Sequence, residues 1–217
     1  MSKKPIIVFE GIEGSGKSYH ITSISRYLRK KKIDHIKIRE PGGSKNAEKI
    51  RKLILNKKSK FNKNTDLLLY LAARSENLTL LKKNYKKKII LIDRFVDSTI
   101  AYQHYGFGVD LNVIKLINKH LLKDIVVDFT FLNKVSTKNM VKRLKKRKSL
   151  NRYDKFKNNF YEKVQNGFLK LASNNKKKYL IIDSNRNKSQ NENLIINKID
   201  ELIWSILIPL NKGNCLV

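Results

Sequence analysis

The segment PIIVFEGIEGSGKSYHITSI, at residues 5–24, constrains the fold more than any other part of the chain. Its apolar run Ile6–Phe9 has the pattern of a short buried strand. Beyond the glycines, apolar residues recur with the spacing of one helix face, at Ile21, Ile24 and Leu28. A strand, a glycine-rich turn and a helix in direct succession predict the first unit of a parallel α/β sheet.

The turn itself fits the phosphate-binding pattern G-x-x-x-x-G-K-[ST], through Gly11, Gly16, Lys17 and Ser18. Glycines let the backbone fold so that successive N–H groups and the helix N-terminus point at phosphate oxygens. In such a loop the lysine reaches the β- and γ-phosphates and the hydroxyl ligates Mg²⁺. The sequence therefore predicts a nucleotide-binding protein.

Length and charge narrow the class further. The 217 residues fit one domain, and the formal net charge is +30. The lysines occur in short runs mixed with asparagine along the whole chain, which indicates a residue-usage bias rather than a specific nucleic-acid surface. No run reaches transmembrane length, and the basic N-terminus lacks the apolar core of a signal peptide. We expect a soluble cytoplasmic protein with no membrane partner, in which the single cysteine, Cys215, is incidental.

Apolar runs predict five strands, at Ile6–Phe9, His35–Arg39, Lys88–Asp93, Ile125–Leu132 and Lys178–Asp183. Helical patterns fill the intervals at about 15–32, 44–56, 65–84, 110–122, 136–147, 155–174 and 190–208. This alternation predicts a five-stranded parallel sheet with helices on both faces. In such sheets the ligand crevice lies beyond the carboxyl ends of the strands.

Polar residues follow three of these strands. Asp93 can hold Mg²⁺ or its waters, and Arg94 can clamp a second phosphate. Glu10 ends the first strand and is expected beside the same metal. The alternatives are an ordinary strand-end cap at Asp93 and a surface charge at Arg94.

The segments FEGIEGSGKS, REPGG, LLLYLAAR, DRFVDSTIAYQ and LNRYD followed by FYEKVQNGFLKLA stand in the same order as in bacterial thymidylate kinases. The chain resembles this family from residue 5 to about 208. The resemblance implies the nucleoside-monophosphate kinase fold and transfer of the γ-phosphoryl group of ATP to dTMP. The product is dTDP, on the way to dTTP. It also implies a requirement for Mg²⁺ and a homodimer.

The resemblance assigns the ATP phosphates to the whole loop: Gly11, Ile12, Glu13, Gly14, Ser15, Gly16, Lys17 and Ser18. By the same resemblance Arg94 bridges the acceptor phosphate, Asp93 organises Mg²⁺ together with Ser18, and Glu10 assists the metal or a sugar hydroxyl.

On the acceptor side, the resemblance implies a pocket lined by Arg39, Glu40 and Arg51. It places Tyr70 against thymine, Arg74 at the O4 edge of the base, Thr99 and Gln103 at the edges of base and sugar, and Tyr102 where a ribose 2′-hydroxyl would lie. Tyr70 and Arg74 are four residues apart on a predicted helix and so share a face. The alternative is a core tyrosine and a solvated arginine.

The segment VKRLKKRKSLNRYD, within about 142–156, resembles a lid that closes over ATP. In the family that the chain resembles, the arginines that stabilise transfer come from the loop or from the lid, and the variable loop positions here carry no basic residue. The resemblance therefore implies that this charge comes from the lid. Arg143 is assigned to ATP binding, and Arg147 and Arg152 are candidate catalytic residues, with Arg152 preferred.

Several positions depart from the family pattern, namely Tyr19, Tyr70, Phe107, Asn151 and Asp154. Two other functions are alternatives to a thymidylate kinase. A kinase for another small acceptor would share the loop but should lack REPGG together with TIAYQ. A nucleic-acid-dependent ATPase would need an apolar strand ending in adjacent Asp and Glu, which this chain lacks.

Overall fold

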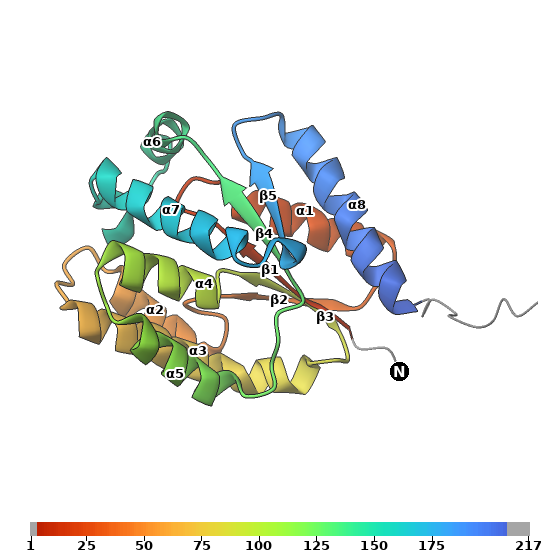
Figure 1. Cartoon of the computed structure of the whole chain (residues 1–217), viewed down its shortest axis with the longest axis horizontal. Helices are drawn as coiled ribbons and strands as arrows, with labels where there is room; N and C mark the ends of the chain where they lie inside the picture. Colours follow the sequence, from red (N-terminus) through yellow and green to blue (C-terminus); the bar gives the residue numbers. More distant parts are fainter. Residues whose placement is uncertain (1–3, 208–217) are drawn as a thin grey trace, which may run out of the picture.

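The computed structural model describes residues 4–207 and confirms the predicted five-stranded parallel sheet (Figure 1). The strands are β1 (Ile6–Glu10), β2 (His35–Arg39), β3 (Ile89–Asp93), β4 (Phe129–Lys134) and β5 (Tyr179–Asp183). Their order across the sheet is β2-β3-β1-β4-β5, and every neighbouring pair is parallel. The glycine-loop strand β1 therefore lies in the centre.

The α-helices are α1 (Lys17–Lys30), α2 (Lys45–Leu55), α3 (Lys63–Asn84), α4 (Val96–Thr99), α5 (Leu111–Leu122), α6 (Thr137–Lys145), α7 (Asn158–Ser173) and α8 (Lys188–Leu207). Helix α4 continues into a π-helical segment, η1 (Ile100–Gly106), and two short 3₁₀ turns are η2 (Arg152–Lys155) and η3 (Lys176–Lys178). The sequence patterns missed α4, η1, η2 and η3, because segments this short carry no clear periodicity.

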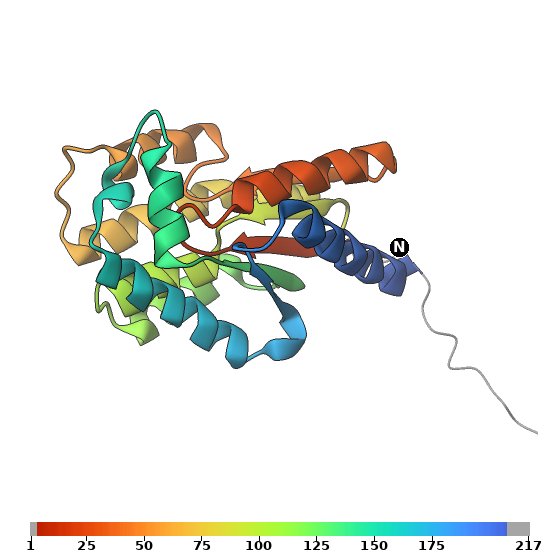
Figure 2. The same ribbon diagram turned by 90° about the horizontal axis from the view of Figure 1, so that it is seen from above.

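Helices cover both faces of the sheet, as Figures 1 and 2 show. On one face, Ile7 and Phe9 of β1 pack with α1 and α8. On the other, Ile6 and Val8 pack toward α3 and α5. The alternation follows from the period of two along a strand, and it turns Glu10 to the same side as Val8.

The largest error in the predicted strands lies at the start of β4, while the other boundaries differ by at most two residues. The apolar run from Ile125 suggested a strand that begins there, but pairing with β1 starts at Phe129. Ile125 is instead buried against the α3 side of the core, and Val126 is exposed. Burial, rather than strand pairing, explains the apolar character of this connection.

None of the described helices is long and apolar enough to cross a membrane. Cys215 and the last residue of the helix expected at 190–208 lie outside the described residues.

Candidate active site

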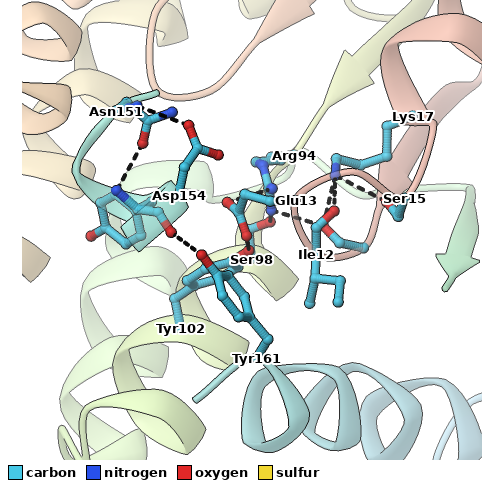
Figure 3. Close-up of polar contacts among 12 residues, drawn as sticks. Ile12, Glu13, Ser15, Lys17, Arg94, Ser98, Tyr102, Asn151, Asp154 and Tyr161 are labelled. Carbon is cyan, nitrogen blue, oxygen red and sulfur yellow. Dashed lines mark hydrogen bonds and ion pairs between the residues drawn. The ribbon is translucent and has the colours of Figure 1, made fainter. Parts of the chain in front are cut away.

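The glycine loop joins β1 to α1 and curls around the side chain of Lys17 (Figure 3). The Lys17 ammonium donates to the carbonyl oxygens of Gly11 at 2.7 Å and Ile12 at 2.8 Å, and to Ser15 Oγ at 3.3 Å. The side chain is buried at the mouth of the first helix. The loop thus holds its own cation where phosphates would be held by backbone N–H groups.

Gly11 is required at the start of this loop. Its φ is +136°, in the region that favours glycine, and a Cβ there would lie 2.3 Å from the carbonyl oxygen of Asn133. The close approach of the loop to β4 therefore excludes any side chain at residue 11.

Burial, and after it the neighbouring Arg94 guanidinium, lowers the pKa of Lys17 to about 7, against the opposing effect of Asp93. An anion that enters the loop would restore the charged form of the lysine. The electrostatics of the loop therefore favour the binding of an anionic ligand.

A cavity of about 200 Å³ opens at the carboxyl ends of the strands, beside the loop. Twelve residues assigned from the sequence line this cavity: Glu13, Lys17, Ser18, Arg39, Glu40, Arg51, Tyr70, Asp93, Arg94, Tyr102, Gln103 and Arg147. Five lining residues carried no assignment: Pro41, Leu55, Ser98, Asn151 and Tyr153. Of these, Ser98 could have been found, because it lies four residues before Tyr102 on one helix face.

Two oxygen ligands suited to Mg²⁺ meet at the mouth of the loop. Ser18 Oγ donates to Asp93 Oδ2 at 3.1 Å, and both residues line the cavity. Within residues 4–207, no group of three or more His, Cys, Asp or Glu side chains could hold a metal by itself. A hydroxyl and one carboxylate fit Mg²⁺, which is typically bound by few protein ligands together with substrate phosphates and waters.

Arg94 follows directly after β3 in a left-handed conformation, with φ of +66°. A non-glycine residue pays about 1 kcal/mol for this backbone geometry. Its guanidinium donates to the Gly11 carbonyl at 2.9 Å and to Glu13 Oε1 at 3.0 Å, and lies 5.2 Å from the ring centroid of Tyr102. These contacts fix the cation beside the phosphate-binding loop.

Of the two glutamates predicted beside the phosphates, Glu10 and Glu13, the one that lines the cavity is Glu13. Glu13 accepts hydrogen bonds from Arg94 and from the Tyr102 hydroxyl (Figure 3). Glu10 is fully buried and does not line the cavity. Its carboxylate accepts from the backbone N–H groups of Phe95 at 2.8 Å and Ser98 at 3.1 Å, so it caps helix α4. Glu10 therefore lies outside the cavity in this structure, and its expected role beside a metal or a sugar hydroxyl stays a prediction.

Burial, and after it the nearby carboxylate of Asp97, raises the pKa of Glu10 to about 7, against the lowering effect of its hydrogen bonds. This carboxylate serves the start of α4 rather than a ligand.

The far end of the cavity carries two further arginines. Arg39 forms a two-point contact with Glu48, through Nε at 3.0 Å and Nη2 at 2.8 Å. Arg51 donates to the carbonyl oxygen of Pro41 at 2.6 Å. Gly42 permits this packing, because a Cβ there would lie 2.5 Å from Glu48 Oε1. Together with Arg94, these arginines make the cavity cationic.

Arg74 and Thr99 lie behind the cavity wall rather than in it. The Arg74 guanidinium donates to Glu40 Oε2 at 2.8 Å, Asn118 Oδ1 at 2.6 Å and Thr99 Oγ1 at 3.0 Å. Its side chain is 1% exposed, and neither residue lines the cavity. Three of the five guanidinium N–H donors of Arg74 are thus engaged behind the wall, and its expected role in reading the base stays a prediction.

Gln103 is the polar side chain without partners in this part of the cavity. It is fully buried on η1 and lines the cavity, and among the described residues neither its amide nitrogen nor its amide oxygen has a hydrogen-bond partner. Tyr70 and Tyr102 line the same space, each with its ring against that of Tyr153. Because a buried unpaired amide is costly, Gln103 indicates a ligand that supplies both a donor and an acceptor.

The three lid arginines have different positions. Arg147 lines the cavity. Arg143 donates to the carbonyl oxygens of Gly14 in the loop, at 2.8 Å, and of Ser184 after β5. Arg152, the preferred catalytic candidate, does not line the cavity but pairs with Asp66 at the start of α3. Arg147 is therefore the lid cation that lines the cavity in this structure, and the catalytic role expected of Arg152 stays a prediction.

The parallel sheet, the phosphate-binding loop on its central strand and the adjoining cationic cavity define a P-loop phosphotransferase of the nucleotide-kinase class. The class alone does not select the acceptor.

Comparison with known proteins selects the family. The thymidylate kinase family model matches residues 9–195. The chain is 37% identical to the thymidylate kinase of Mycoplasma capricolum over 204 residues, which cover 90% of this chain and 96% of the relative. It is 34% identical to that of Kosmotoga olearia, over 82% of this chain and 86% of the relative.

A crystal structure of thymidylate kinase from Ehrlichia chaffeensis superimposes with a TM-score of 0.72 and 30% identity, covering 91% of this chain and 98% of that one. The chain belongs to the thymidylate kinase family.

Proposed function

We propose that the protein transfers the γ-phosphoryl group of ATP to dTMP, giving dTDP and ADP, with Mg²⁺ required. The observation that carries this proposal is one cavity that joins the glycine loop to the buried, unpaired amide of Gln103. A nucleoside monophosphate can reach both ends at once, with its phosphate at the loop and its base at the amide.

On the donor side, the loop would bind the ATP phosphates, with the ammonium of Lys17 turning from the loop carbonyls toward the β- and γ-phosphates. Ser18 and Asp93 would hold Mg²⁺, which supplies charge neutralisation between the phosphates when bound. Arg143 rests on the loop at Gly14, a position from which it can contact the nucleotide.

On the acceptor side, the carboxamide of Gln103 offers a donor and an acceptor side by side, which complements the N3–H and a carbonyl of thymine. Tyr70 supplies an aromatic face for the ring, and Tyr102 restricts the space beside the sugar. The Glu13 carboxylate can accept a hydrogen bond from a sugar hydroxyl.

Catalysis in this site consists of positioning and fixed charge. Arg94 would bridge the acceptor phosphate and hold it in line with the γ-phosphate of ATP, and Arg147 would face the transferring group from the lid. A loose phosphoryl-transfer transition state needs no covalent protein intermediate, so no nucleophilic side chain is required.

Product analysis tests the proposal. Purified protein with ATP, Mg²⁺ and dTMP should form dTDP and ADP in equal amounts, resolved by ion-exchange chromatography. Excess EDTA should stop the reaction. ADP formation without dTDP, or dTDP formation that EDTA leaves unchanged, would contradict it.

We further propose a homodimer, formed through α2, α3 and α5, which Figure 1 shows grouped on one side of the molecule. The support is a set of exposed large apolar side chains on these helices, namely Leu53, Leu68, Val113 and Leu116. Light scattering should give a dimer mass for the wild type and a monomer mass for Leu68→Glu with Leu116→Glu. A monomeric wild type would contradict the dimer alone. A cytoplasmic location fits an enzyme that uses ATP and dTMP.

A further inference from the structure

The side chain of Arg147 reaches the cavity from a segment with little regular structure, between α6 and η2. The Arg147 side chain is 39% exposed, and its Nη1 donates to Asp154 Oδ1 at 2.5 Å. The side chain of Asp154 is 0% exposed. A long arginine on such a segment loses side-chain entropy on being fixed in one orientation. A buried carboxylate partner reduces the number of orientations available to it before substrate binds.

Asp154 is itself held in one orientation. Its second oxygen, Oδ2, accepts from the backbone N–H of Asn151 at 2.8 Å, and Asn151 Oδ1 accepts from the N–H of Tyr153 at 2.8 Å. These reciprocal bonds form the capping box at the start of η2 (Figure 3). Both carboxylate oxygens of Asp154 are therefore used, one by the turn and one by Arg147.

The turn is fastened to α3 by a second buried carboxylate, Asp66. The side chain of Asp66 is 3% exposed and accepts from Arg152 Nη2 and from the hydroxyl of Tyr153. The Arg152 guanidinium lies 5.4 Å from the ring centroid of Phe61 and 4.9 Å from that of Tyr153. Rotating η2 away from α3 would leave a buried carboxylate without its partners, which is costly.

We propose that Asp66 and Asp154 are positioning residues for phosphoryl transfer. Asp66 fixes η2 to α3, and Asp154, on that turn, directs the guanidinium of Arg147 into the cavity. The inference rests on the proposed role of Arg147 in stabilising the transferring phosphoryl group. It also explains why Arg152 faces away from the cavity, since Arg152 is part of the anchor and Arg147 is the cation that the anchor presents.

A double-mutant cycle between Arg147 and Asp154 tests whether Asp154 positions Arg147. Arg147→Ala and Asp154→Ala should each lower kcat by about tenfold or more, with the KM for dTMP changed by less than about threefold, because a displaced transition-state cation acts mainly on kcat. The double variant should lie within about twofold of Arg147→Ala, because the carboxylate has nothing left to position. An equal fold-loss of kcat from Asp154→Ala in the wild type and in Arg147→Ala would overturn the proposal.

Asp66→Asn, made in the wild type and in Arg147→Ala, tests whether Asp66 acts through Arg147. It should lower kcat severalfold when Arg147 is present and by less than about twofold in Arg147→Ala. If thermal denaturation shows that Asp66→Asn does not fold at the assay temperature, Tyr153→Phe takes its place, since it removes only one hydroxyl from the same anchor. A loss of kcat independent of Arg147 would assign Asp66 to stability alone and overturn its role.

Asp200→Asn is the matched control. Asp200 accepts from the hydroxyl of Tyr27, so it forms a similar tyrosine–carboxylate contact between α1 and α8, on the other face of the sheet. This control should change kcat by less than about twofold in either background. If Arg147→Ala leaves kcat unchanged while the wild type phosphorylates dTMP, the positioning proposal fails and the proposed reaction stands. If the wild type makes no dTDP, the proposed reaction itself fails.

Discussion

The state of Lys17 predicts that nucleotide binding takes up a proton. In the ligand-free loop the Lys17 ammonium is enclosed by carbonyl oxygens, and burial followed by the Arg94 charge lowers its pKa to about 7. At pH 8 roughly nine-tenths of the molecules would then carry a neutral lysine, and at pH 6 about one-tenth. The phosphates of a nucleotide favour the charged form and raise this pKa again. Binding at pH 8 should therefore take up about 0.9 proton at Lys17, and binding at pH 6 about 0.1.

Isothermal titration calorimetry with a non-hydrolysable ATP analogue and Mg²⁺ measures this uptake, from binding enthalpies in buffers of different ionisation enthalpy. Lys17→Met is the matched control, because it keeps a long apolar stem and removes the titrating group. The wild type minus Lys17→Met difference should be about 0.9 proton at pH 8 and should shrink toward zero at pH 6. A difference near zero at pH 8, with both proteins folded and binding, would refute the argument for a depressed lysine pKa.

Three further outcomes are expected. Lys17→Ala should lower kcat at least about 100-fold while the melting temperature changes little, since it removes charge aimed at the phosphates; near-wild-type turnover would exclude the loop assignment. Gln103→Leu should raise the free energy of unfolding by about 1 kcal/mol in urea, because two buried unpaired polar atoms disappear. The same variant should raise the KM for dTMP roughly 5- to 100-fold. An unchanged KM would exclude Gln103 from the base site. Glu10 has a folded-state pKa of about 7, which is raised above its unfolded value of 4.5. Its protonation therefore contributes stability that is fully present below about pH 4.5 and is lost as the pH rises through 7. The melting temperature of Glu10→Gln relative to wild type should accordingly increase between pH 5 and pH 8, and a pH-independent difference would argue against a raised pKa.

Much of the fold could be predicted because strand and helix periods are local properties of the sequence. The run Ile6–Phe9 and the helix spacing after Ser18 depend on neighbouring residues only, and both elements form where expected. The start of β4 depends instead on which residues pair with β1. Since that pairing joins segments more than 100 residues apart, the apolar run from Ile125 could not reveal it.

The acidic residues show what a closer use of the sequence could have given. Ile6, Val8 and Glu10 share one side of β1 by the period of two, and that side is the α3 face of the sheet. Glu10 therefore faces the helices packed on that side of the sheet. Glu13 lies in the loop itself and lines the cavity. The alternation of side chains along β1 could be predicted from the sequence, whereas the helices that cover each face could not.

The arginines were harder to predict, because each has several carboxylates within reach and only the folded chain decides among them. Arg74 lies one turn from Tyr70, as expected, but Glu40 and Asn118 approach from β2 and α5 and engage its guanidinium. In the lid, four residues separate Arg147 from Arg152, and the position of Asp66 on a distant helix determines which of them lies outside the cavity.

The most direct test of the central claim is the rate of phosphoryl transfer to a panel of acceptors, dTMP, dUMP, dCMP, UMP and dGMP, with saturating ATP and Mg²⁺. A thymidylate kinase should give the highest kcat/KM for dTMP and a lower value for dUMP, which lacks the methyl group. The values for dCMP, UMP and dGMP should be at least about 100-fold below that for dTMP, because each leaves a polar group unpaired or does not fit beside Tyr102. A higher kcat/KM for dCMP, UMP or dGMP than for dTMP would contradict the account.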